Sequence, residues 1–224
     1  MSLLGLIVIL VIAWVYYWCF RHPSFDEVSL DEVLSKNKFK TGDLILFKAV
    51  DNFNGSFIMS YYGHIGVVYA DSTGVYVFEA ANTTNMTLNP DQNANGIFMS
   101  PLADRIKMYK GYAFYKELKD PLDAATCDEF RSFIDYCIEN MSYETRVMAN
   151  GIKKGMGEKI GMQVNCGELV FLSLIKLGLL PLEYYYKPAF HHLRWMCDIK
   201  ILPENEYLEP VKLTYSPIAH GFLH

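Results

Sequence analysis

The sequence predicts a mixed α+β domain, and two kinds of apolar pattern predict it. The first half of the chain contains short runs rich in β-branched and aromatic residues, bounded by turn signals. The second half contains longer apolar patterns with helical spacing. The 224 residues suffice for one domain with a sizeable core. We therefore expect a small antiparallel sheet packed on helices.

The predicted strands all lie before residue 116. They are residues 43–48, 65–69, 75–79, 97–100 and 112–115. A turn signal at residues 71–74, which reads Asp-Ser-Thr-Gly, joins the second strand to the third as a hairpin. A short helix or turn that contains Asp104 and Arg105 separates the last two strands. The stretches 49–63 and 81–96 are predicted loops.

Two helices are predicted in the second half. Thr126 and Glu129 fit a capping box, and apolar residues then recur at helical spacing. The other helix opens at Cys166, continues through the apolar run 169–180 and is closed by Gly178. Residues from 181 onward are rich in Tyr and Pro and show no clear pattern.

The N-terminus predicts a membrane anchor. Residues 3–20 carry no charge, and a helix of this length spans ~27 Å, close to the thickness of a bilayer core. Aromatic side chains crowd its C-terminal end, as in an interfacial belt: Trp14, Tyr16, Tyr17 and Trp18. A cleaved signal peptide and a buried helix are the alternatives. The absence of a positive n-region and of small cleavage-site residues favours an uncleaved anchor.

We therefore expect three parts: an anchor at 1–22, a charged connector at 23–40 and a hydrolase domain at 41–224. Ser29 and Glu32 fit a capping box for a helix in the connector. Lysines and an arginine follow the span and none precedes it, which weakly favours a cytoplasmic domain. Four N-x-S/T sequons would permit glycosylation in a lumen. The side of the membrane stays open, with a virion or internal membrane among the alternatives.

Composition argues against two classes of partner. The net charge of −5 and the lack of a Lys/Arg cluster argue against nucleic acid. Five cysteines without a C-x-x-C pair argue against a disulfide framework and a zinc site. Adjacent side chains point apart in regular structure, so His191 and His192 do not form a metal pair. We expect no metal and no cofactor.

A helix-start cysteine and a strand-start histidine predict a thiol hydrolase. The Cys166 thiol faces unpaired backbone N–H groups and the positive end of the helix dipole, and both favour the thiolate. His64 begins a predicted strand, so its imidazole would lie at a strand end and act as the base. Glu168, in the first helical turn, is interpreted as structural.

Cysteine hydrolysis also needs a group that orients the base and donors for the oxyanion. Glu79 ends the strand that pairs with the His64 strand. The two strands run antiparallel, so we expect Glu79 beside His64. The backbone N–H of Cys166 would supply one oxyanion donor. Tyr62, Tyr143 and Asn165 are the candidates for the other, and the sequence does not choose among them.

Four stretches in this order resemble the permuted papain-like branch of the NlpC-type superfamily, close to the YiiX-like amidases and their large-DNA-virus relatives. They are residues 41–47, 63–68, 77–80 and 166–170; relatives often carry Ser where this chain has Gly167. The resemblance implies a permuted papain-like fold and a thiol-dependent attack on an amide or ester. It implies Cys166 as nucleophile, His64 as base and Glu79 as the orienting residue. The anchor, the tail and the loop before His64 lie outside it.

The leading hypothesis is a membrane-anchored cysteine hydrolase or acyltransferase that acts on an amide, thioester or ester of a peptide or lipid. Tethering at residues 3–20 favours a substrate at the membrane. The first alternative is a catalytically idle structural or interaction protein on the same scaffold, such as a virion membrane component. The second is a lipid- or peptide-binding module whose pocket is lined by the aromatic loop 53–62.

Overall fold

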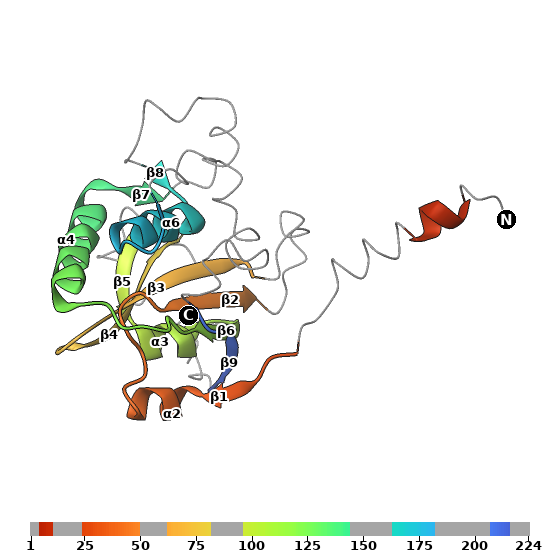
Figure 1. The fold of residues 1–224 in the computed structure, drawn as a ribbon, viewed down its shortest axis with the longest axis horizontal. Coiled ribbons are helices and arrows are strands. Elements are labelled where there is room, and N and C mark those ends of the chain that lie inside the picture. The colour runs from red at the N-terminus through yellow and green to blue at the C-terminus, as the bar shows by residue number, and fades with distance from the viewer. Residues whose placement is uncertain are drawn as a thin grey trace, which may run out of the picture.

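The computed structural model describes residues 5–10, 24–49, 62–81, 96–143, 163–181 and 207–215. Within these ranges the chain is a mixed α+β structure built on a seven-stranded sheet with the order β1-β9-β6-β2-β3-β4-β5 (Figure 1). The strands are β1 Glu27–Ser29, β2 Leu44–Ala49, β3 His64–Asp71, β4 Gly74–Ala80, β5 Ile97–Pro101, β6 Gly111–Lys116 and β9 Val211–Thr214. The helices are α2 Leu30–Ser35, α3 Leu102–Met108, α4 Ala124–Asn140 and α6 Cys166–Lys176. A separate two-stranded sheet pairs β7 Ser142–Tyr143 with β8 Gln163–Val164.

The sheet is larger than the small antiparallel sheet that the sequence predicts. All five predicted strands form, and β1 and β9 extend the sheet beyond β6. β9 runs antiparallel to β6 and parallel to β1, so the sheet has one parallel pair. These two strands are too short for alternation to show in the sequence. They come from the segment assigned to a connector and from the Tyr- and Pro-rich tail.

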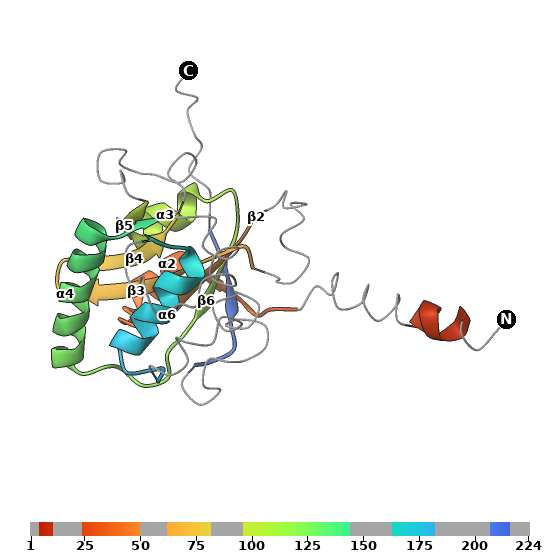
Figure 2. The ribbon, with the colours of Figure 1, turned by 90° about the horizontal axis from the view of Figure 1, so that it is seen from above.

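Both faces of the sheet are covered by helices, because its central strands are apolar on both sides. In β2, Leu44 and Leu46 pack with residues of α4 and α6, whereas Ile45 and Phe47 pack with residues of α2 and α3. Complete burial of one such side chain contributes roughly 1.5–3 kcal/mol. Figure 1 shows α4 and α6 on one side of the sheet and α2 on the other. Figure 2 shows α4 beside α6.

The hairpin turn predicted at residues 71–74 joins β3 to β4 and fixes their register. Asp71 Oδ1 accepts hydrogen bonds from the backbone N–H groups of Thr73 at 2.7 Å and Gly74 at 3.2 Å. This turn pairs Val67 of β3 with Phe78 of β4. In an antiparallel pair, the residue after Phe78 then lies opposite the residue before Val67. The register therefore sets Glu79 opposite Gly66, on the sheet face that also carries His64.

Two predicted capping boxes are wrong: the one at Ser29 lacks its side-chain hydrogen bond, and α4 has a different N-cap residue. Ser29 is the N-cap residue of α2, but its side chain makes no capping hydrogen bond. α4 starts earlier than Thr126 because the Asp123 carboxylate accepts the Thr126 N–H at 2.7 Å. Asp is a better N-cap than Thr, which explains the earlier start. α6 begins at Cys166 as predicted, and Gly178 follows it with φ 72°.

The predicted anchor lies mostly outside the described residues. Residues 5–10 are helical, with exposed side chains from Leu6 to Leu10. In the described part of the chain, no helix is both long enough and apolar enough to cross a bilayer.

Candidate active site

His64 is the first residue of β3 and is buried at the end of the strand. Phe47 of β2 is its register partner, and the two ring centroids lie 5.5 Å apart. His64 Nε2 lies 2.5 Å from Glu79 Oε2. A carboxylate only accepts hydrogen bonds, so Nε2 carries the proton and donates it. The antiparallel pairing of β3 with β4 thus brings together the histidine and the glutamate that the sequence predicts to be neighbours.

Glu79 is completely buried, and a glycine leaves room for it. Gly66 stands opposite Glu79 across the β3–β4 ladder. A Cβ at Gly66 would lie 2.5 Å from Val77 Cγ2 and 3.3 Å from Glu79 Cβ. Because Gly66 has no side chain, the Val77 and Glu79 side chains pack directly over its backbone, and the Glu79 carboxylate reaches His64 two residues along β3.

Arg105 of α3 is the second partner of the Glu79 carboxylate, and the sequence did not identify it as part of the site. Its Nε donates to Oε1 at 2.5 Å and its Nη2 to Oε2 at 2.9 Å. The side chain is only 2% exposed. Its guanidinium carbon lies 4.7 Å from the Phe47 ring centroid and 5.5 Å from that of Tyr109. A usable sequence signal did exist, since Arg105 shares the apolar stripe of α3 with Leu102 and Ile106.

The buried pair has shifted pKa values in opposite directions. Burial alone would raise the pKa of Glu79, but the Arg105 charge and the hydrogen bond with His64 lower it to about 2. Burial alone would lower the pKa of His64, but hydrogen bonds and charge interactions with Cys166 and Glu79 raise it to about 9. His64 is therefore an imidazolium at neutral pH.

Cys166 is the first residue of α6, and its side chain is partly exposed. Asn165 is the N-cap: its Oδ1 accepts the Glu168 N–H at 2.9 Å, and Glu168 Oε2 accepts the Asn165 N–H at 3.0 Å. This reciprocal capping box agrees with the structural interpretation of Glu168. α6 packs against β3 and β4, which places the Cys166 thiol close enough to His64 to help raise the pKa of the imidazole.

The chain that enters α6 is held by the small sheet. Tyr143 of β7 pairs with Val164 of β8, two residues before Cys166. Gly96, with φ 75°, packs closely against Tyr143 of this pair. A Cβ at Gly96 would lie 2.5 Å from Tyr143 Cβ and 2.8 Å from the Ala81 carbonyl oxygen. The position of the nucleophile therefore depends on a left-handed glycine far from it in sequence.

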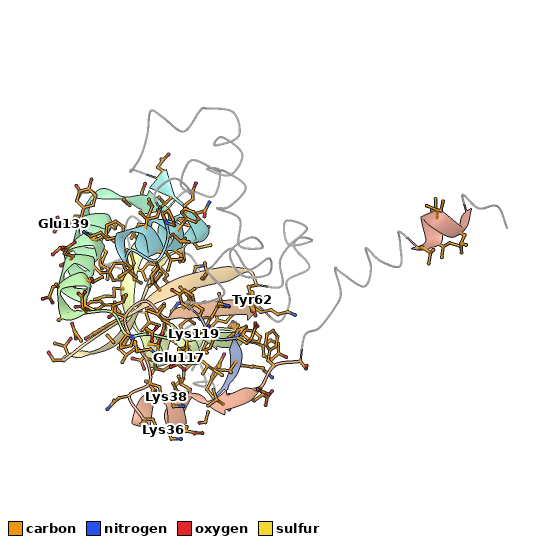
Figure 3. All side chains as sticks on the ribbon, viewed as in Figure 1. Lys36, Lys38, Tyr62, Glu117, Lys119 and Glu139 are labelled. Atoms are coloured by element: carbon orange, nitrogen blue, oxygen red, sulfur yellow. The ribbon has the colours of Figure 1, made fainter. Side chains whose placement is uncertain are left out.

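The three oxyanion candidates have different surroundings. Tyr62 lies near the start of β3 and is 3% exposed, with its ring against Phe25 and Phe114 at 6.5 and 5.3 Å (Figure 3). Tyr143 is half-buried in β7. Asn165 Nδ2 is buried, and in the described part of the chain this atom has no hydrogen-bond partner. Such an unsatisfied donor is costly and needs an explanation.

The chain was compared with known proteins. No protein-family model matches it, and no curated protein matches it. Among solved structures it is similar to the metalloprotein YiiX from Escherichia coli O157:H7, with 14% identity and a TM-score of 0.41. The match covers 79% of this chain and 97% of YiiX. YiiX is a member of the family that the four sequence stretches resemble. At this TM-score the match carries no weight for the site, which rests on the chain's own contacts.

The side chains do not form a metal site where the structure describes them. Within those ranges no three His, Cys, Asp or Glu side chains are grouped closely enough to hold a metal ion. The Glu79 carboxylate is already engaged by Arg105 and His64. His191 and His192 lie outside the described residues.

Proposed function

We propose that this protein is a cysteine hydrolase of the permuted papain-like, NlpC type that cleaves an amide or ester through Cys166, His64 and Glu79. One observation carries the proposal: a single buried imidazole lies 2.5 Å from a buried carboxylate, and the thiol at the start of α6 is near enough to raise the pKa of the same imidazole. A histidine with a purely structural role in the core would need only one hydrogen-bond partner. Thiol catalysis requires a nucleophile next to a base, and the base next to a group that orients it.

The first step is attack by sulfur. Because Nε2 of His64 is bound to Glu79, Nδ1 is the ring nitrogen left for Cys166. A proton held on Nδ1 leaves a thiolate, which is the nucleophilic form. The thiolate attacks the substrate carbonyl carbon, a C–S bond forms and the carbonyl oxygen becomes an oxyanion. Nδ1–H then protonates the leaving amine or alcohol, whose bond to the carbonyl carbon breaks.

The second step releases the acyl group. His64, now neutral, accepts a proton from water, and the resulting hydroxide equivalent attacks the thioester carbon. The C–S bond breaks, the acid leaves and the proton returns to the sulfur–imidazole pair. Transfer to another hydroxyl or amine in place of water would give an acyltransferase, so both reactions remain within the proposal.

Asn165 is the best-supported second oxyanion donor. Its Oδ1 is used in the cap of α6, whereas the buried Nδ2 has no partner among the described residues. An amide N–H beside the nucleophile would gain that partner when an oxyanion forms. Tyr62 is less suitable because its ring is part of the aromatic core.

The membrane attachment is a separate part of the proposal and rests on the uncharged sequence of residues 3–20. An anchored enzyme would act on peptide or lipid substrates at the membrane surface. Flotation of the full chain with liposomes tests this: we expect deletion of residues 1–22 to abolish flotation. Flotation of the deleted chain would refute the anchor and leave the thiol chemistry untouched.

Peptide-resolved alkylation by iodoacetamide tests the thiol chemistry on the detergent-solubilised full chain. We expect Cys166 to react at pH 7 at least ten times faster than Cys127, which is also partly exposed. His64→Asn should remove most of this difference, and Cys166→Ser should abolish hydrolysis of p-nitrophenyl acetate. Equal alkylation of Cys166 and Cys127, with turnover unaffected by Cys166→Ser, would favour the idle scaffold.

A further inference from the structure

We propose that Arg105 is a positioning residue that neutralises Glu79, so that the thiolate of Cys166 becomes the counter-charge of the His64 imidazolium. The inference rests on the proposed thiol chemistry and deepens it. It concerns the charge state of the site before substrate binds. Cys166, His64 and Glu79 alone do not determine this charge state.

Charge alternation along the site supports this role. Four groups follow one another from α3 to α6: Arg105, Glu79, His64 and Cys166. The guanidinium binds both carboxylate oxygens, and Oε2 is shared with His64 Nε2. The first two groups already form a neutral pair. An imidazolium next to that pair is best balanced by an anion on its other side, which is the sulfur.

Removing the guanidinium would change this balance. The Glu79 carboxylate alone would then balance the imidazolium, and a thiolate would add a second, uncompensated negative charge. In a buried site, a nearby like charge shifts the pKa of an ionisable group by about one to several units. In a chain without Arg105, the charge balance would therefore no longer favour an anion at the Cys166 sulfur.

The guanidinium is fixed in place, as such a role requires. Its central carbon lies over the Phe47 ring, 4.7 Å from the centroid, and the same ring lies 5.5 Å from the His64 ring. Tyr109 adds a second aromatic contact at 5.5 Å. These contacts partly offset the cost of burying a cation. A lysine could supply the charge but not the bidentate geometry.

The pH dependence of this site has a limited set of contributors. The titratable and charged groups around the pair are Glu79 and His64 from the sheet, Arg105 from α3, Tyr109 and Tyr215 from the following segments, and Cys166 and Glu168 from α6. Burial raises the pKa values of Tyr109 and Tyr215, so both tyrosines stay neutral through the working range. Glu168 Oε2 accepts the Asn165 N–H in the α6 cap.

The test is the pH profile of Cys166 alkylation by iodoacetamide in the full chain, followed by peptide-resolved mass spectrometry. Arg105→Met should move the half-maximal pH upward by about one unit. Arg105→Lys should stay within about 0.3 units of the parent, since the charge remains. Arg131→Met is the matched control: Arg131 also faces an aromatic ring and a carboxylate, those of Tyr69 and Asp135, but lies on the surface. Its midpoint should not move.

A double substitution separates charge from structure. In Glu79→Gln with Arg105→Met both charges are gone and an amide faces His64, so the midpoint should return to within about half a unit of the parent. This variant and Arg105→Lys decide the matter if Arg105→Met does not fold. An unmoved midpoint in Arg105→Met, or a double variant displaced upward by a full unit, overturns the role of Arg105. Slow alkylation of Cys166 in the parent at every pH would instead overturn the proposed function.

Discussion

The helices α4 and α6 lie side by side on one face of the sheet and begin in similar ways, yet only one of them presents a candidate nucleophile. Each starts at a side-chain N-cap, Asp123 for α4 and Asn165 for α6. Each carries a partly exposed cysteine in its first turn or just after it, Cys127 and Cys166. The helix dipole acts on both.

The difference lies in what the rest of the fold places against each thiol. Cys166 is in contact with a buried imidazole, whereas no hydrogen bond to the Cys127 thiol is found among the described residues. The caps also differ in chemistry, since the N-cap of α4 is the Asp123 carboxylate and that of α6 is the Asn165 amide. A cysteine at a helix start is thus a necessary part of this candidate site, and its partner from β3 is what distinguishes it.

The largest expected effect is on turnover, when the N-cap residue of α6 is substituted and the N-cap residue of α4 serves as the control. Asn165→Ser keeps an oxygen acceptor for the α6 cap but removes Nδ2. If Nδ2 binds the oxyanion, p-nitrophenyl acetate turnover should fall about 100-fold, while alkylation of Cys166 changes less than about threefold. Asp123→Ser makes the matched change in α4 and should leave turnover unaltered. A parallel fall in alkylation and turnover would assign Asn165 to the cap alone.

A pair of glycines tests how far the α6 start depends on its support. Gly96 and Gly178 both have positive φ, but a Cβ at Gly178 meets nothing within 4 Å. Gly178→Ala should therefore lower the free energy of unfolding by about 1 kcal/mol, the cost of the left-handed backbone. Gly96→Ala adds the clash with Tyr143 and should cost about 2–3 kcal/mol and slow Cys166 alkylation. Denaturant unfolding measures both, and equal costs would show that Tyr143 gives way without disturbing α6.

The smallest expected effect is a pH dependence of stability. The pKa of His64 is raised to about 9, so its contribution is complete below about pH 6.5 and is lost as the pH rises through 9. The pKa of Glu79 is lowered to about 2, so its contribution is present above about pH 4.5 and is lost as the pH falls through 2. The pair therefore stabilises the fold most between about pH 4.5 and 6.5.

His64→Asn should accordingly lower the free energy of unfolding by on the order of 1–3 kcal/mol at pH 6, and by much less at pH 10. Asp123→Asn, at the cap of α4, should leave the slope between pH 6.5 and 9 as it is in the parent. Urea unfolding at a series of pH values provides the measurement. A constant difference between the parent and His64→Asn across this range would contradict the raised pKa.

Local sequence signals determined the elements that carry the site. Alternation and the Asp-Ser-Thr-Gly turn predicted β3 and β4, and their antiparallel pairing predicted that His64 and Glu79 would be neighbours. The structure places those side chains 2.5 Å apart, and their catalytic roles stay predictions. The start of α6 at Cys166 and its end before Gly178 were also predictable, because capping and left-handed glycines act within one helical turn.

Other features were decided only by tertiary structure. β1 and β9 are strands because β6 leaves an edge that they complete, and neither is long enough to show its own pattern. Arg105 became part of the site because α3 packs its apolar stripe against β4, and only that packing brings the guanidinium to a carboxylate 26 residues away.

The physical reason for this division is the range of the interactions. Propensity, turn chemistry and capping involve residues within a few positions of one another, so the sequence alone determined β3, β4 and α6. Burial of a charge and completion of a sheet edge depend on segments that meet only after folding. The same holds for Asn165 Nδ2, which has no partner among the described residues. For this reason the sequence could name Cys166, His64 and Glu79, whereas the charge balance among them became visible only with Arg105 in place.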